Sequence, residues 1–546
     1  MNKLPDKMKR KSFPEKTHPV PWESLFSLFS YLIPVLLLLI FRYFFPANIC
    51  DDAFISFKTA LNLSNGNGMV FNLGQKIYVC TTPLWVFLLA ITRLLTSDVI
   101  IAAKCLGILF EILFLLSIVH LGFITLNDRS VGMLAAVLIC TNPIYLQTSF
   151  SGMELSLYLF LIVFSLILLV NKKYMAGLTF ASLAIWARID GLIIFAVVLS
   201  WTFFVHRNEI FDNIKSMFFK LLPSSAIIGS YILFGLFYFG SVIPSSVQSK
   251  SRMTPRFFSP GWIAGTKEVL FQFIYVFIGK SGGHENFNTP SLALVIPLII
   301  GLFIIITKKK KNAFPLLAFT LLYACAFIGT GNSYAIWFPW YFVPVLPGLY
   351  LIAALGYSEV FSMVIRWLAS PGLIEQSLIK QAIVLMLVAV LWTFIMLGPL
   401  KQSINKVSYY HTYKRERLYA STSVWLGRYL EKGATIAANE IGAVGFFSRS
   451  DIHILDMFGL LRKKEEIAKP YLELMQKRPP EAVLTLQQFS YTEGIITTMK
   501  DIYIWLKFND LEIGLRKDIF PVLYPHLSEV NKIYTTINID GRELFW

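Results

Sequence analysis

Two adjacent carboxylates, Asp51 and Asp52, follow a long apolar segment in the stretch ICDDAFISFKTALNLSNGNGMVFN. A carboxylate at the rim of a cavity has a pKa tuned by its neighbours, and such a group can act as a general base that takes a proton from an attacking hydroxyl. The alternative is structural, because a helix N-terminus also favours a carboxylate and an amphipathic helix is predicted to follow. One carboxylate is enough for a cap, so the pair favours chemistry.

Three further ionisable residues, Glu154, Arg188 and Asp190, lie at the ends of apolar segments. Charged side chains are costly in lipid and normally face a cavity or a charged partner. These residues are therefore candidates for substrate binding. Arg188 and Asp190 have an alternative role, an ion pair at the membrane interface whose long side chain extends to the head groups.

Most of the chain is predicted to lie in a membrane. Hydrophobic residues make up 55% and charged residues 15% of the 546 positions, whereas a soluble protein has roughly a quarter of its residues charged. Residues 1–400 hold 29 Lys and Arg against 16 Asp and Glu, and residues 401–546 hold 20 against 17. The basic excess thus belongs to the apolar part, where it orients loops rather than binding nucleic acid.

The alternation of the spans depends on the short apolar segment 82–95. A span needs roughly 17–25 residues, and the basic arm 1–23 is predicted to stay in the cytoplasm. If 82–95 crosses the membrane, Lys172 and Lys173 fall outside; if it lies along the outer surface, the basic connections fall inside. We adopt the second arrangement. It predicts a mostly α-helical membrane domain, residues 24–400, with the C-terminus outside and eleven spans at 24–45, 99–125, 131–149, 153–170, 174–187, 191–206, 221–240, 291–307, 313–330, 341–358 and 381–400.

This topology places the polar connections on the extracytoplasmic face. They are the first outer loop, 46–98, and the stretches SFSGMEL, WARIDGL, FGSVIPSSVQSKSR, GKSGGHENFNTP and GTGNSYAIWFPWY. Any chemistry therefore faces away from the cytoplasm.

From residue 401 the composition becomes polar. Helical spacing over 403–433, followed by short β-prone runs broken by Gly and Asn, predicts an extracytoplasmic soluble α/β domain over 401–546. The stretch NEIGAVG (439–445) is only superficially like a phosphate-binding loop, because it lacks the G-x-G-x-x-G spacing. A dinucleotide-binding role is not predicted.

The five cysteines give no metal-binding framework. Cys105, Cys140 and Cys325 lie in apolar spans and are predicted to be packing residues. Cys50 and Cys80 both fall in the first outer loop, where a disulfide forms only if their Cα atoms come close enough. No cofactor is predicted and no metal ligand is assigned, and the sequence leaves a divalent-metal requirement open.

The stretch DDAFISFKTALNLSNGNGMVFNLGQKIYVCTTPLW (51–85) resembles the first outer loop of membrane glycosyltransferases of the GT-C fold. The resemblance is closest to the terminal arabinofuranosyltransferases of cell-wall arabinan and their uncharacterised bacterial relatives. Their pattern runs Asp-Asp-Ala-Phe-Ile, a Gly-x-Gly turn followed by Phe-Asn or Trp-Asn, and Thr-Ser-Pro-Leu-Trp. The resemblance covers most of residues 24–460, in order, through SGMELSLY, ARIDGL, FYFGSVIPSSVQSK, WYFVPVLPGLYLIAALG and IGAVGFFSRSDIHILDMFGL.

What the resemblance implies agrees with the predicted topology. Nucleotide sugars are absent outside the cytoplasm, so a transferase there draws a monosaccharide from a polyprenyl-phosphate carrier. It passes the sugar, with inversion, to a glycan or lipid acceptor on the outer face of the cell membrane. In the family an Asp of the first outer loop activates the acceptor hydroxyl. This implies Asp51 as the base and Asp52 as an orienting group, or the two in reverse order.

The leaving phosphate gains negative charge as its bond breaks, so a cation placed on it acts selectively in the transition state. The first candidate is Lys250, which matches the family's Lys after an outer Pro turn, with Arg252 and Arg188 behind it. Each of these has an alternative role as an anchor for lipid head groups. His284 lies in a Gly-rich loop and is either part of a lid over the donor or a solvated side chain.

Two departures from the family leave the sugar open. The family's Pro-Asn-Thr-x-x-x-Lys is Pro-Ser-Ser-Val-Gln-Ser-Lys here (244–250), and its Gly-Gly-Asp is replaced by GTGNSY. The alternatives are a GT-C transferase acting on protein or lipid A, and a lipid-sugar flippase or transporter, although the sequence shows no inverted repeats. The C-terminal domain is expected either to guide a polymeric acceptor or to close the outer loops.

Overall fold

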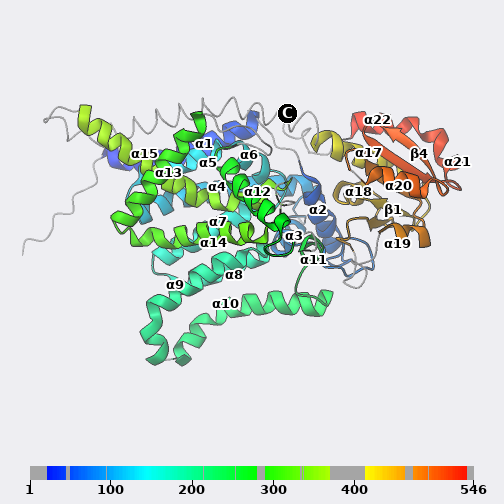
Figure 1. Ribbon diagram of the computed structural model, residues 1–546. Coiled ribbons are helices and arrows are strands. Elements are labelled where there is room, and N and C mark those ends of the chain that lie inside the picture. Colours follow the sequence, from blue (N-terminus) through cyan, green and yellow to red (C-terminus); the bar gives the residue numbers. More distant parts are fainter. Residues whose placement is uncertain are drawn as a thin grey trace, which may run out of the picture.

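The computed structural model describes most of the chain. The described residues are 21–44, 49–93, 95–212, 214–251, 254–279, 289–332, 335, 337–368, 412–461, 471–489 and 491–537. They form a helical bundle and a C-terminal domain containing a sheet, and Figure 1 shows the helix α2 (Asp51–Ser64) between the two.

The bundle combines long apolar helices with shorter ones. Besides α2 it contains α1 (Pro21–Phe44), α3 (Pro83–Thr92), α4 (Val99–Leu126), α5 (Arg129–Cys140), α6 (Pro143–Ser149), α7 (Leu155–Val170), α8 (Tyr174–Ala187), α9 (Gly191–Asp212), α10 (Ile214–Phe234), the π-helix η1 (Gly235–Phe239), α11 (Ser245–Ser251), α12 (Pro260–Phe277), α13 (Thr289–Thr307), α14 (Phe314–Thr330), the 3-10 turns η2 (Lys311–Ala313), η4 (Pro339–Tyr341) and η5 (Val343–Val345), and α15 (Leu346–Leu368).

Within the described residues, five helices are long and apolar enough to cross a membrane, or six if the bent pair α5 and α6 forms one span. Helices occupy ten of the eleven predicted positions, and 381–400 lies outside the described residues. The predicted count of eleven spans is therefore not confirmed. The segment 82–95 forms α3, whose ten residues reach about 15 Å, half the thickness of a hydrocarbon core.

Two features of the bundle differ from the sequence prediction. The predicted span 131–149 is broken, because α5 and α6 meet at an angle of 72°. Pro143 cannot continue the hydrogen bonds of α5, and the Asn142 side chain starts α6 by accepting from the backbone N–H groups of Ile144 and Tyr145 at 2.9 and 3.0 Å. The predicted spans also omit α12, whose apolar run is interrupted by two charged residues, Lys267 and Glu268.

Glycines bring α13 and α15 into close contact. A Cβ at Gly301 would lie 1.9 Å from the carbonyl oxygen of Ile352, and a Cβ at Gly356 would lie 1.9 Å from that of Pro297. Small residues at such crossings are how membrane helices gain packing contacts without a hydrophobic driving force. The contact fixes α15 against the bundle, and with it the 3-10 turns that precede α15.

Connections predicted to share one face of the membrane lie together. The Lys310 ammonium donates to the carbonyl oxygen of Leu126 at 3.3 Å, and the Ser358 hydroxyl donates to the Asp128 carboxylate at 3.2 Å. Two of the connections predicted to be cytoplasmic, 127–129 and 308–311, are thus neighbours. Which face is cytoplasmic stays a prediction.

The C-terminal domain is an α/β domain, the class that its sequence predicts. Its elements are α17 (Thr412–Tyr429), β1 (Thr435–Ala438), α18 (Gly442–Phe447), β2 (His453–Asp456), α19 (Tyr471–Lys477), β3 (Ala482–Leu486), α20 (Thr492–Met499), β4 (Tyr503–Phe508), β5 (Leu511–Arg516), α21 (Phe520–Leu523), the 3-10 turn η7 (Tyr524–His526) and α22 (Ser528–Thr536). The strand order is β2-β1-β3-β5-β4. β1 is parallel to β2 and β3, with Ile436 opposite Ile454 and Ala482, and β5 is antiparallel to β3 and β4.

The predicted sidedness has a direct test by cysteine labelling. Val522 is exposed in the C-terminal domain, and Lys309 is exposed in the basic connection. With Cys105 and Cys325 changed to Ser, a membrane-impermeant thiol reagent added to intact cells should label Val522→Cys and leave Lys309→Cys unlabelled until the cells are opened. The reverse pattern would overturn the topology.

Candidate active site

A pocket lies where the connections predicted to be extracytoplasmic meet the C-terminal domain. It holds about 630 Å³ of empty space, part of it open to solvent, and is lined by Asp52, Ile55, Ser56, Val79, Cys80, Thr81, Thr82, Met153, Glu154, Arg188, Ser246, Val247, Lys250, Trp340, Tyr341 and Leu460. The predicted topology puts six polar connections on one face, and the pocket joins residues from five of them. The sixth, GKSGGHENFNTP (279–290), lies mostly outside the described residues. Leu460 comes from the C-terminal domain.

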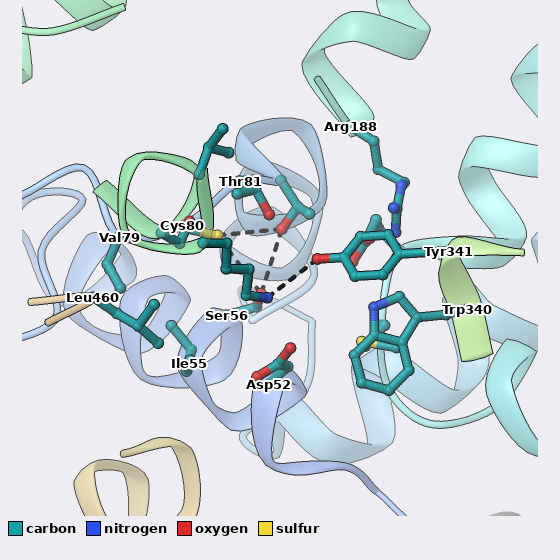
Figure 2. A pocket seen from close by; sticks show the side chains of 16 residues that line it. Asp52, Ile55, Ser56, Val79, Cys80, Thr81, Arg188, Trp340, Tyr341 and Leu460 are labelled. Atoms are coloured by element: carbon teal, nitrogen blue, oxygen red, sulfur yellow. Dashed lines mark hydrogen bonds and ion pairs between the residues drawn. The ribbon is translucent and has the colours of Figure 1, made fainter. Parts of the chain in front are cut away.

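Asp52 is the carboxylate of the pair that faces this pocket. It is the second residue of α2, and Figure 2 shows its side chain below Ser56 and across from Trp340 and Tyr341. No hydrogen bond to another described residue holds its carboxylate. A carboxylate in this position can accept a hydrogen bond from a substrate hydroxyl.

Asp51 has a different environment, although it is the adjacent residue. Its side chain is buried, and its two oxygens accept hydrogen bonds from the backbone N–H groups of Gly442 and Ala443 at 3.0 and 2.8 Å. Successive residues of a helix are rotated by about 100°, which is why one carboxylate faces the pocket and the other faces α18. Among the described residues, neither carboxylate caps its own helix.

Lys250 reaches the pocket from α11. Its ammonium donates a hydrogen bond to the hydroxyl oxygen of Tyr341 at 3.1 Å. It also lies 4.6 Å from the ring centre of Phe338 and 5.6 Å from that of Tyr341. Cation–π contacts of this kind stabilise an ammonium while leaving it charged.

Arg188, Asp190 and Glu154, predicted from separate positions, form one buried network. The Arg188 guanidinium donates to Glu154 Oε1 at 2.9 Å and to Asp190 Oδ1 at 3.0 Å. The Tyr323 hydroxyl donates to Asp190 Oδ2 at 2.6 Å. Only 6% of the Arg188 surface is exposed, so this ion pair does not extend to the head groups.

Tyr341 connects the two cations, and sequence reasoning did not select it. Its hydroxyl accepts from Lys250, and its ring centre lies 5.3 Å from the Arg188 guanidinium carbon, as does that of Tyr158. The signal was an aromatic run, FPWYF, in a connection predicted to be extracytoplasmic. Aromatic residues are so common in this chain that the run does not separate a site residue from packing.

Three small polar groups line the pocket beside Asp52 and were also not predicted. Ser56 Oγ lies 3.4 Å from Thr82 Oγ1, and the Cys80 thiol lies 3.2 Å from the same oxygen. Cys50 and Cys80 are both free thiols, so the disulfide considered from the sequence is not formed. Two predicted substrate-binding residues, Arg252 and His284, lie outside the described residues. The described residues contain no group of three or more His, Cys, Asp or Glu placed to hold a metal ion.

Solved structures similar to this chain identify its fold. ArnT from Cupriavidus metallidurans in the apo state shares 12% identity at a TM-score of 0.54, over 90% of this chain and 97% of that chain. The same protein bound to undecaprenyl phosphate shares 12% identity at a TM-score of 0.50, over 91% and 98%. The chain has the GT-C fold of membrane glycosyltransferases.

Two further comparisons match only part of the other protein or only part of this chain. A mutant of the mycobacterial arabinofuranosyltransferase AftD shares 11% identity over 90% of this chain and 41% of that chain, at a TM-score of 0.38. A family model described as a domain of unknown function, DUF8728, matches residues 407–529, which belong to the C-terminal domain. No curated protein matches the sequence significantly.

An acidic cluster lies at the junction of the GT-C bundle and the C-terminal domain. It consists of Asp51, Glu416 and Glu440 around the Arg415 guanidinium, which contacts Glu416 and donates to Glu440 Oε1 at 2.8 Å. Burial raises the pKa of Glu416 to about 7 and that of Glu440 to about 8, against the opposing effect of Arg415. Burial also raises the pKa of Asp51, while Arg415 and the two N–H groups of α18 lower it. One guanidinium does not neutralise three carboxylates.

The acidic cluster makes the stability of this junction pH-dependent. An unfolded Glu has a pKa of roughly 4.3, so the folded state retains protons that the unfolded state has lost. The stabilisation is complete below that value and is lost as the pH rises through about 7 to 8, the folded pKa values of Glu416 and Glu440. The melting temperature of the full-length protein should fall between pH 5 and pH 9.

Glu440→Gln should flatten this dependence, because its amide carries no titratable proton. Glu473→Gln, at a half-exposed position of α19, is the matched control and should keep the wild-type dependence of the melting temperature on pH. A Glu440→Gln profile that tracks the wild type would contradict the assignment.

Proposed function

We propose that this chain is an integral membrane glycosyltransferase that transfers a monosaccharide from a polyprenyl-phosphate carrier to a glycan or lipid acceptor on the extracytoplasmic face of the cell membrane. The observation that carries the proposal is that Asp52 and Lys250 line the same pocket. An acid with no described protein partner faces a cation held by aromatic rings. The binding of undecaprenyl phosphate by ArnT, a protein of the same fold, supports the carrier class.

The reaction assigned to the pocket is a single displacement. The acceptor hydroxyl attacks the anomeric carbon of the donor, and its proton passes to the Asp52 carboxylate. The bond between that carbon and the phosphate oxygen breaks, and the polyprenyl phosphate leaves with the electron pair. One displacement inverts the anomeric configuration.

Lys250 is assigned to the leaving phosphate. The charge of Arg188 is already matched by Glu154 and Asp190, so this residue shapes the pocket and holds Tyr341 rather than binding phosphate. Lys250 lies against Tyr341 and Phe338 and lines the same pocket as Asp52. A cation there stabilises the charge that develops as the phosphate leaves.

The base is tested by exchanging the Asp52 carboxylate for an amide. Mass spectrometry of surface glycans and lipids from a deletion strain first identifies the product that is lost. With that acceptor and donor, Asp52→Asn should lower kcat by about 10²–10⁴-fold, the usual cost of losing a general base, and donor binding should be kept. Full activity in Asp52→Asn would overturn its role as the base.

The phosphate-binding cation is tested by Lys250→Gln. A hydrogen bond to a charged group contributes about 1.5–3 kcal/mol, so kcat/KM should fall about 10- to 100-fold, and Lys250→Arg should restore part of it. Lys267→Gln, which removes the same charge from the exposed face of α12, should be unchanged. Equal activity in the Lys250→Gln and Lys267→Gln variants would remove Lys250 from the site.

A further inference from the structure

The C-terminal domain holds both helices that carry the charges of the proposed site. It holds α2 through the hydrogen bonds from Gly442 and Ala443 to Asp51, one residue before Asp52. It holds α11 through the segment after β2: the Ser249 hydroxyl donates to the carbonyl oxygen of Gly459 at 3.0 Å, and the Ser245 hydroxyl donates to that of Leu460. These serines precede Lys250 on the same short helix.

A third contact joins the C-terminal domain to Asn72, in the loop that follows α2. The Asn72 side-chain amide donates to the carbonyl oxygen of Ile454 at 2.9 Å and accepts from its N–H at 3.0 Å. Asn72, Ser245 and Ser249 are all buried. Breaking a buried hydrogen bond leaves an unsatisfied group, which costs more than the net contribution of the bond itself. The domain is therefore joined to the bundle by specific hydrogen bonds between buried groups, and does not merely lie over it.

The contact with α2 also depends on glycine. A Cβ at Gly442 would lie 1.8 Å from the carbonyl oxygen of Asp51 and 2.8 Å from its carboxylate carbon. A Cβ at Gly445 would lie 2.3 Å from the Phe71 ring. A side chain at Gly442 requires α18 to move away from α2, and a side chain at Gly445 requires the Phe71 ring to move.

We propose that the C-terminal domain is part of the catalytic unit, because it sets the position of Asp52 relative to Lys250. Asp51, Ser245 and Ser249 are the positioning residues, and they act through the two helices that they fix. This inference rests on the proposed function, which gives Asp52 and Lys250 their roles. Reacting groups have to be held closely, since a displacement of about 1 Å can cost 10²-fold in rate.

The experiment compares two glycine-to-alanine variants of the full-length protein in the same domain. Gly442→Ala pushes α18 away from α2. Gly494→Ala, on α20, is the matched control, because a Cβ there meets nothing within 4 Å. Gly442→Ala should lower kcat about 10- to 100-fold with little change in the KM for the acceptor, and Gly494→Ala should match the wild type.

A different split between the kinetic constants would overturn the inference. A domain that only recruits the acceptor predicts a higher acceptor KM with kcat unchanged in Gly442→Ala. A domain that only covers the loops predicts no difference between the two variants. If Gly442→Ala does not fold, the Ser245→Ala/Ser249→Ala double variant loosens α11 alone and should show the same loss of kcat.

Backbone hydrogen exchange separates failure of this inference from failure of the proposed function. A wild-type protein that transfers no sugar from a polyprenyl-phosphate carrier would overturn the proposed function. Exchange is measured without substrate, so it still decides whether the domain holds the helices. The amides of Ser245–Ser251 should exchange faster in Gly442→Ala than in Gly494→Ala; equal exchange there would overturn the positioning role.

Discussion

The hydrogen bonds between the Asp51 carboxylate and the backbone N–H groups of Gly442 and Ala443 are the interaction on which the arrangement of the site depends. A buried carboxylate requires donors, and the first turn of α18 supplies two. Because Asp51 is held in this way, the rotation of α2 about its axis is fixed. The next residue, Asp52, is then directed into the pocket.

The same interaction explains why NEIGAVG resembles a phosphate-binding loop without being one. Its N–H groups at Gly442 and Ala443 bind an anion, but that anion is a side chain of the same protein. The binding site is therefore occupied from within the fold. Its partner lies 391 residues away along the chain, beyond what any local motif describes.

The charges around the pocket are organised by aromatic rings as much as by ion pairs. Tyr341 contacts Lys250 through its hydroxyl and Arg188 through its ring, so the two cations are kept apart by one side chain. Arg188 is compensated by two carboxylates. This division lets one cation serve the structure while the other serves the leaving phosphate in the proposed reaction.

The sequence by itself predicted the helical bundle, the C-terminal α/β domain and the five connections whose residues line the pocket. Long apolar runs report burial or lipid exposure directly, and the polar connections between them could be grouped by charge. It did not show the bend at Asn142 and Pro143, because a Pro inside an apolar run is also compatible with a continuous span. The spans predicted from the sequence omitted α12, because Lys267 and Glu268 lower the apolar character of that helix.

Only the tertiary structure decided which of Asp51 and Asp52 faces the pocket. The two residues have the same chemistry and adjacent positions, so every local argument applies equally to both. Their roles separate because a helix rotates by about 100° per residue and because α18, from the far end of the chain, binds one side of α2. The same reason applies to Tyr341, whose place between Lys250 and Arg188 results from contacts among three distant segments.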